Sequence, residues 1–273
     1  MTTGPVARAA DAHVDHAAAG TRVRTLLDTG PPDAGLLDNR LPDTRLPDTR
    51  QAGLGLVRRL AEIPPGALLD GTAGSAGELW FVIGGRGRLA SAGQAGLPLG
   101  PDRGLWIPPD MKYRIYAAGP ADLLIDAVTL PAGTPEPGRP ADAAAAGHPE
   151  QRDQATPQAR DLRDCEVETT GDRRFRVLFG PGQGCAAATQ FLGEIPAGRA
   201  PEHSHPYDEV VLVLEGAGVL HLNGADSPLS AGTCVHLPRR QLHCLENTGA
   251  VTMRVLGVFH PADSPAAKAE MRL

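Results

Sequence analysis

The sequence predicts an all-β protein built from two small β-barrels, and three observations lead to that prediction. Gly (33) and Pro (26) are abundant while aromatic residues make up 4% of the chain, which suits short strands joined by turns better than long helices. Short apolar runs separated by turn residues occur over residues 53–130 and again over 163–262. The two stretches resemble each other, which indicates that one plan of strands is used twice.

Composition excludes several classes of function. The formal charge of −6 over 273 residues lacks the basic footprint of a nucleic-acid-binding protein, although local arginines could still bind a small anionic substrate. No run of 18 apolar residues and no apolar N-terminal stretch is present, so we expect a cytoplasmic protein without membrane segments. Cys165, Cys185, Cys234 and Cys244 form no Cys-x-x-Cys pair, and we expect free thiols.

Residues 1–52 are predicted to be a flexible leader. From Leu26 to Arg50 it carries a five-residue repeat with Asp in third place, as in LPDTR. Such units favour turns and break both helices and central strands. The repeat is either a docking arm or a flexible leader that arose by slippage.

The first predicted barrel covers residues 53–130, and a Pro- and Ala-rich linker follows at 131–162. Its expected strand-bearing segments are residues 54–66, 78–85, 85–93, 104–109, 112–119 and 122–130. The second predicted barrel covers residues 163–262, and a tail without strand signal follows at 263–273. Its expected strand-bearing segments are residues 175–180, 185–196, 208–216, 218–224, 232–238, 243–249 and 252–259.

Histidine distinguishes the two halves. AEIPPG at 61–66 matches GEIPAG at 193–198, and ELWFVIGGRG at 78–87 matches EVVLVLEGAG at 209–218. None of the chain's nine histidines falls between residues 53 and 130. Any chemistry that needs imidazole therefore belongs to the second half.

A candidate metal site lies in the second half. His203 and His205 are two residues apart, so both side chains point to one face of an extended segment. Glu209 has the same parity, and His243 follows in a later strand pair. Three imidazoles and one carboxylate converging inside a barrel predict one divalent metal ion. The alternative is a set of ordinary surface or core histidines.

These residues match the two sequence motifs of the cupin superfamily. The first motif resembles the segment that contains Gly198, His203, His205, Glu209 and Gly216, with one residue fewer in its first loop. The second resembles the segment that contains Gly232, Pro238, His243 and Asn247. Arg240 stands where the family usually has glycine, which affects a turn and not a ligand.

The resemblance implies two cupin (double-stranded β-helix, jelly-roll) barrels, that is, a bicupin over residues 53–262. The N-terminal barrel would be degenerate. It retains Glu78 and Gly85, but Thr72 and Gly74 occupy the His-x-His positions and Tyr113 stands in place of the last histidine. We therefore expect no metal in that half.

The donor set suits Fe(II), Mn(II), Ni(II), Zn(II) or Cu(II), and we favour Fe(II). Four protein ligands leave open positions, as a catalytic metal needs. The sequence favours a non-haem dioxygenase, an oxidoreductase acting on a small oxygenated metabolite. Metal-dependent Lewis-acid lyase, isomerase, cyclase or hydrolase chemistry is the alternative, and a non-catalytic ligand-binding cupin is a third reading.

Candidate substrate-binding residues are Gln190, Tyr207 and Arg254, chosen for their place in or near the motif strands. Arg199 and Glu202 flank the ligands and are interpreted as loop residues. His221 and His236 lie outside the motif and are expected to be structural. Because cupins commonly pair through barrel edges, we also expect a homodimer.

Overall fold

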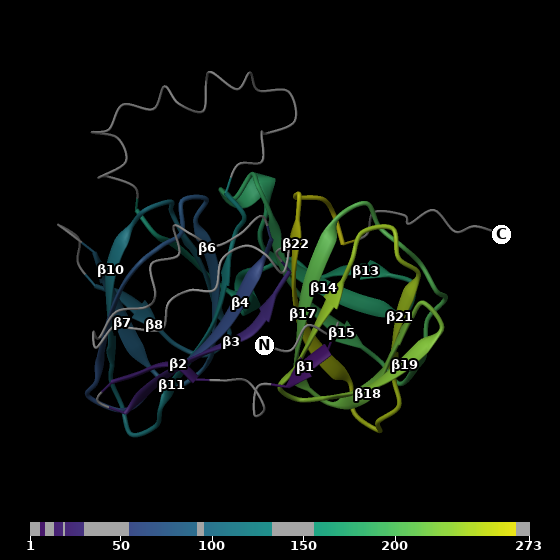
Figure 1. The fold of residues 1–273 in the computed structure, drawn as a ribbon, viewed down its shortest axis with the longest axis horizontal. Coiled ribbons are helices and arrows are strands. Elements are labelled where there is room, and N and C mark those ends of the chain that lie inside the picture. Colours follow the sequence, from purple (N-terminus) through teal and green to yellow (C-terminus); the bar gives the residue numbers. More distant parts are fainter. Residues whose placement is uncertain are drawn as a thin grey trace, which may run out of the picture. The chain divides into compact units, whose positions relative to one another are not determined.

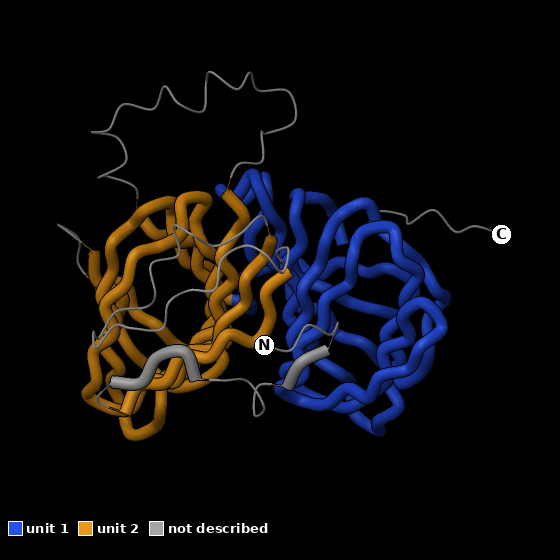
Figure 2. Tube along the Cα trace, in the orientation of Figure 1, with its two compact units in different colours: residues 1–12, 162–273 blue, residues 13–161 orange. Residues whose placement is uncertain are grey.

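The structure is a computed structural model and describes residues 6–8, 14–18, 20–29, 55–91, 96–132 and 156–265. These residues form β-strands and short 3-10 turns, with no α-helix among them (Figure 1), which confirms the predicted all-β class. They divide into two compact units (Figure 2): unit 1 comprises residues 1–12 and 162–273, and unit 2 comprises residues 13–161. Within the described part of the chain, no helix has the length and apolar character needed to cross a membrane.

Unit 2 contains a seven-stranded sheet, in the order β12-β9-β6-β11-β4-β3-β2, and a four-stranded sheet, in the order β5-β10-β7-β8. All its neighbouring strands are antiparallel. The strands are β2 (Val14–Ala18), β3 (Thr21–Asp28), β4 (Val57–Ile63), β5 (Leu68–Thr72), β6 (Glu78–Gly84), β7 (Gly87–Ser91), β8 (Leu97–Leu99), β9 (Arg103–Ile107), β10 (Lys112–Ala117), β11 (Leu123–Thr129) and β12 (Gln158–Asp161).

Strand β10 shows how sequence alternation builds this unit. Its residues alternate strictly between exposed and buried, because successive side chains on a strand point to opposite faces. The buried set (Tyr113, Ile115 and Ala117) joins one apolar core with residues such as Ile63, Trp80 and Leu105. The core therefore lies between the two sheets.

Strand β3 departs from the predicted flexible leader. Thr21–Asp28 pairs with β4, and Val23, Leu26 and Leu27 are buried. Pairing with β4 and burial of these apolar side chains outweigh the turn propensity of the repeat, which begins at Leu26. Strands β1 (Val6–Arg8) and β2 also fall within the predicted leader. Residues 30–50 of the repeat lie outside the described residues.

The predicted linker also contributes a strand. Gln158–Asp161 forms β12 beside β9, and Asp161 accepts two hydrogen bonds of 2.8 Å from Arg103. The ion pair fixes the end of this segment to unit 2. Residues 133–155 of the linker and residues 266–273 of the tail lie outside the described residues.

A polar cluster occupies the unit 2 core at the level of Glu78. The buried carboxylate accepts hydrogen bonds from Trp80 Nε1 at 2.7 Å, from the Thr129 hydroxyl at 3.2 Å and from the Gly74 amide at 3.3 Å. Burial raises the pKa of Glu78 in spite of these bonds. The Tyr113 ring meets the Trp80 ring edge-on, with 4.7 Å between centroids.

Strand register corrects the alignment of the two barrels by one residue. Tyr113 pairs with Gly71, just as His243 pairs with His203 in unit 1. The positions that correspond to His203 and His205 are therefore Gly71 and Ala73, not Thr72 and Gly74. A Cβ atom at Gly71 would lie 2.4 Å from Tyr113 Cζ, so the tyrosine ring fills this space.

Unit 1 repeats the architecture, with sheets ordered β1-β20-β17-β22-β15-β14-β13 and β16-β21-β18-β19. Its core lies between them and includes Val211, Leu220, Leu237 and Val255. The elements are β1, η3 (Leu162–Asp164), β13 (Glu168–Thr170), β14 (Arg173–Phe179), η4 (Pro181–Gln183), β15 (Thr189–Ile195), β16 (Gly198–Arg199), β17 (Asp208–Glu215), β18 (Ala217–Leu222), β19 (Ala225–Ser230), β20 (Thr233–Leu237), β21 (His243–Asn247) and β22 (Met253–His260).

Candidate metal centre

Two segments bring the four predicted ligands together inside unit 1. His203 forms an isolated antiparallel bridge with His243, the first residue of β21, through reciprocal backbone hydrogen bonds of 3.0 and 2.9 Å. His205 follows two residues later, and Glu209 lies near the start of β17. The His243 ring centroid lies 4.6 Å from both the His203 and the His205 centroids. The structure thus gathers side chains from both sheets at one end of the barrel.

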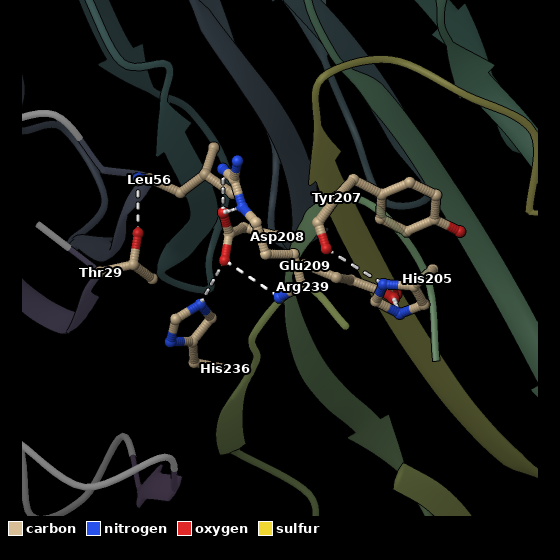
Figure 3. A network of polar contacts seen from close by, with 8 residues as sticks. All are labelled: Thr29, Leu56, His205, Tyr207, Asp208, Glu209, His236 and Arg239. Carbon is tan, nitrogen blue, oxygen red and sulfur yellow. Dashed lines mark hydrogen bonds and ion pairs between the residues drawn. The ribbon is translucent and has the colours of Figure 1, made fainter. Parts of the chain in front are cut away.

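Each imidazole is oriented by a backbone carbonyl. The Nδ1–H groups of His203, His205 and His243 donate to carbonyl oxygens at 3.4, 3.1 and 2.9 Å, and Figure 3 marks the bond from His205 to Tyr207. Because a carbonyl can only accept, Nδ1 carries a proton, and in the neutral ring Nε2 then keeps its lone pair. Metal-binding histidines are held in the same way.

Electrostatics also favours the neutral, ligand-competent imidazoles. Burial lowers the pKa of His243 to about 4, and the neighbouring His203 and His205 act in the same direction. Burial is likewise the main cause that lowers the pKa of His203. At neutral pH both rings are therefore uncharged, as metal coordination requires.

The contact between His205 and Glu209 tests whether a metal fits. His205 Nε2 is buried without a hydrogen-bond partner, although Glu209 Oε2 lies 3.0 Å away. Two cis ligands about 2.1 Å from a six-coordinate ion lie about 3.0 Å apart. A shared cation would satisfy both atoms, and the donor set therefore fits a divalent metal.

The four side chains do not have the geometry of a complete coordination sphere. Among the described residues, no three His, Cys, Asp or Glu side chains form a group with the geometry to hold a metal ion. The ring centroids of His203 and His205 lie 6.1 Å apart, farther than either lies from the His243 centroid. The ligand assignment accordingly stays a prediction, supported by the tautomers and the unpaired His205 nitrogen.

A row of aromatic rings packs against the His205 side of the candidate metal centre. The Tyr207 ring stacks on His205 at 4.1 Å and on Phe259 at 4.2 Å between centroids. Phe191 continues the row, 5.8 Å from Phe259. Tyr207 and Phe259 are buried, so they fix the ring of His205 and keep water from that side.

Gly257 lets Phe191 approach the ligands. It lies between Val211 and Phe191 in the sheet. A Cβ atom here would lie 2.2 Å from Phe191 Cε1 and 2.9 Å from Glu209 Oε1. The missing side chain at this position therefore makes room for both the phenyl ring and the carboxylate.

The sequence-based substrate candidates have different positions. Tyr207 lies beside His205, as described. Gln190 and Arg254 do not reach the site, because strand alternation turns both to the opposite face of the sheet from Glu209. Arg254 lies 4.0 Å from Glu215. The sequence does not single out Phe191, Phe259 and Gly257 as site residues. The only pattern that could indicate them is strand alternation, which places them on the same face of the sheet as Glu209.

The outer face of the sheet carries a separate polar cluster. Asp208 is adjacent to Glu209 but faces outwards. Its Oδ2 accepts hydrogen bonds from both Nε and Nη2 of Arg239, and its Oδ1 lies 3.3 Å from His236 Nε2 (Figure 3). Burial would raise the pKa of Asp208, but hydrogen bonds from His236 and Arg239 outweigh it and lower that pKa. This cluster joins β17 to the end of β20 and gives His236 a structural role. Arg199 and Glu202 form an exposed ion pair of 3.1 Å with each other.

The family of this chain follows from sequence comparison. Residues 192–259 match the family described as Cupin domain. Polyketide synthase CurC of Streptomyces cyaneus is 31% identical over 112 residues, which cover 40% of this chain and 71% of CurC. The tetracenomycin polyketide synthase protein TcmJ of Streptomyces glaucescens is 33% identical over 90 residues, which cover 32% of this chain and 60% of TcmJ. The chain belongs to the cupin superfamily.

Solved structures confirm the two-barrel architecture. A Bacillus subtilis oxalate decarboxylase structure aligns with a TM-score of 0.66 and 13% identity, covering 97% of this chain and 79% of the other. A putative glyoxylate-induced protein from Pseudomonas aeruginosa aligns with a TM-score of 0.60 and 14% identity, covering 93% and 84%. At these identities the likeness shows the fold alone, and that fold is a bicupin.

Proposed function

We propose that unit 1 is the catalytic centre of a metal-dependent enzyme, with one divalent ion held by His203, His205, Glu209 and His243. The observation that carries the proposal is the unpaired His205 Nε2 lying 3.0 Å from Glu209 Oε2, beside two neutral imidazoles. Bound there, the ion would supply Lewis-acid polarisation of a substrate oxygen. Mn(II) is a candidate beside Fe(II), because oxalate decarboxylase of Bacillus subtilis contains Mn(II) centres.

The residues around the ion have their own parts in this proposal. The carbonyls that accept from the three Nδ1–H groups keep every Nε2 available and hold the rings in orientation. Glu209 supplies the negative charge that offsets part of the ion's charge. Tyr207 and Phe259 exclude water behind His205 and thereby strengthen electrostatic interactions at the site.

We further propose non-redox conversion of a small oxygen-bearing metabolite, as by a lyase, isomerase, cyclase or hydrolase. Lewis-acid activation requires only positive charge, which all five candidate ions supply, whereas oxygenation requires a redox-active ion. The matched relatives TcmJ and CurC are named as polyketide synthase proteins, which supports an oxygen-rich polyketide-like substrate. The second candidate is the dioxygenase predicted from the sequence, which the nitrogen and oxygen donors would also suit with Fe(II).

One experiment separates the two candidates. The full chain is purified without added metal and analysed for bound metal, then loaded separately with Zn(II), Mn(II) and Fe(II). Enediols, catechols and enolisable diketones are offered while oxygen is recorded. Non-redox chemistry predicts conversion with Zn(II) or Mn(II) and no oxygen uptake. Substrate-dependent uptake with Fe(II) alone would establish the dioxygenase instead, and failure to bind any of these ions would reject both.

A further inference from the structure

Arg173 lies on the inner face of the metal-binding barrel. It is the first residue of β14, and its neighbour Arg174 pairs with Glu194 on the outer face of the sheet. Strand alternation therefore turns Arg173 inwards. In agreement, its Nη2 donates a hydrogen bond of 2.6 Å to the carbonyl oxygen of Leu245 on β21, in the opposite sheet.

Arg173 differs from the outward-facing arginines of β14 in having no carboxylate partner within the described part of the chain. Arg174 and Arg176, which face outwards, lie 3.1 and 3.3 Å from Glu194. Among the described residues, no Asp or Glu forms an ion pair with Arg173, and the hydrogen bond to Leu245 uses one of its five N–H donors. A half-buried cation without a counter-charge is therefore a favourable place for an anion to bind.

The guanidinium is close enough to influence the predicted ligands. Leu245, its hydrogen-bond acceptor, lies two residues beyond His243 on β21. The pKa of His203 is lowered mainly by burial, and the charge of Arg173 acts in the same direction. Arg173 and the metal centre thus face the same interior.

Solvent reaches this part of the interior. Arg173, Val177, Phe191 and His203 are only partly buried, whereas core residues such as Val211 and Leu237 are almost fully buried. Val177 and Phe191 are direct neighbours in the sheet. The accessible inner face therefore combines one cation, an apolar surface and the outermost histidine of the site.

We propose that Arg173 is a specificity-determining residue that binds an anionic group of the substrate, a carboxylate or an enolate, while the apolar body of that substrate contacts Phe191. The inference rests on the proposed metal function. A divalent ion, one glutamate and one arginine leave a net charge of about +2 in the loaded site, which favours an organic anion. The guanidinium fork suits the two oxygens of a carboxylate.

Two planar probes of the same shape test this assignment. Salicylate is an anion, whereas salicylamide is neutral at pH 7. Calorimetric titration of the Zn(II)-loaded full chain is expected to show salicylate binding more tightly. In Arg173→Gln the Kd of salicylate should rise about 10- to 100-fold, as for a lost hydrogen bond to a charged group, while the Kd of salicylamide should change less than about threefold. Arg174→Gln, which changes the adjacent outward-facing arginine, is the matched control and should leave both values unaltered.

Other results would overturn the proposal. Wild-type protein that does not prefer salicylate, unchanged salicylate binding in Arg173→Gln, or equal weakening for both probes would each do so. Arg173→Met, which keeps the apolar stem, replaces the Gln variant if that one does not fold and carries the same expectations. Zinc content is measured in every sample. A chain that binds no zinc refutes the proposed metal function, whereas an Arg173-dependent preference for salicylate in such a chain would still support the anion site.

Discussion

Replacing Gly257 with alanine is expected to weaken metal binding without touching a ligand. The new methyl carbon would lie 2.2 Å from Phe191 Cε1, whereas carbon atoms in contact prefer about 3.5–4.0 Å. The ring must therefore move by more than about 1 Å. Glu209 Oε1 would lie only 2.9 Å away, so the carboxylate must shift as well. Overpacking of this kind costs about 1–3 kcal/mol.

Displacement of a ligand's support typically costs about 10- to 100-fold in metal affinity, and a loss of that size is expected for Gly257→Ala. The assay is titration of metal-free protein with Zn(II) in competition with a chromophoric chelator. Gly182→Ala is the control, because a Cβ atom there would have no neighbour within 4 Å. In a chain that already carries Phe191→Leu, Gly257→Ala should cost less affinity than it does in the wild type, since the clashing ring atoms are gone. Wild-type affinity in Gly257→Ala, or an equal cost in the two backgrounds, would refute the reasoning.

Three further predictions concern the ligands, a buried ion pair and an outward-facing histidine. His205→Ala should remove most bound metal with an unchanged circular dichroism spectrum; unchanged metal content would show that the ligand assignment is wrong. Asp126→Ala removes the carboxylate that Arg58 binds at 2.7 and 2.9 Å, with both side chains fully buried. The loss of this buried ion pair should lower the free energy of unfolding, measured in urea, by about 3–5 kcal/mol. Asp70→Ala, which removes an exposed ion pair with Arg114, is the control and should hardly move the urea midpoint. The hydrogen bond from His221 to Glu246, and then that to Asp226, raise the pKa of His221 above 6.5. The stabilising contribution of His221 is therefore fully present below about pH 6.5 and is lost as pH rises through the higher pKa of the folded state. His221→Gln should flatten the dependence of melting temperature on pH in this range, and an unaltered dependence would contradict the prediction.

Much of the fold and of the candidate site could be predicted from the sequence because both depend on short-range spacing. The strand segments follow from apolar runs between turn residues, and the convergence of His203, His205 and Glu209 follows from side-chain parity. His243 is predicted as a ligand through motif spacing. The structure shows how His243 is positioned, because reciprocal backbone hydrogen bonds hold it opposite His203.

The remaining features depend on contacts that are distant in sequence. Strand β3 was missed because its stability comes from pairing with β4, some thirty residues away. Gln190 was misplaced because its strand turns it to the outer face. Arg173 gave no signal, since its place is defined by the Leu245 carbonyl on another sheet. Pattern within one segment shows which face a side chain takes but not which segment lies opposite.

The packing of Tyr113 on Gly71 limits which substitutions the N-terminal barrel can accept. A histidine at position 71 would begin with a Cβ atom 2.4 Å from the tyrosine ring, so it could be accepted only after Tyr113 had become smaller. Loss of Tyr113 alone would in turn leave Trp80 without its edge-on neighbour and open a gap beside Glu78. Each single step towards a second histidine site thus passes through a less stable intermediate. A histidine pair in the N-terminal barrel would therefore require Gly71 and Tyr113 to be replaced together.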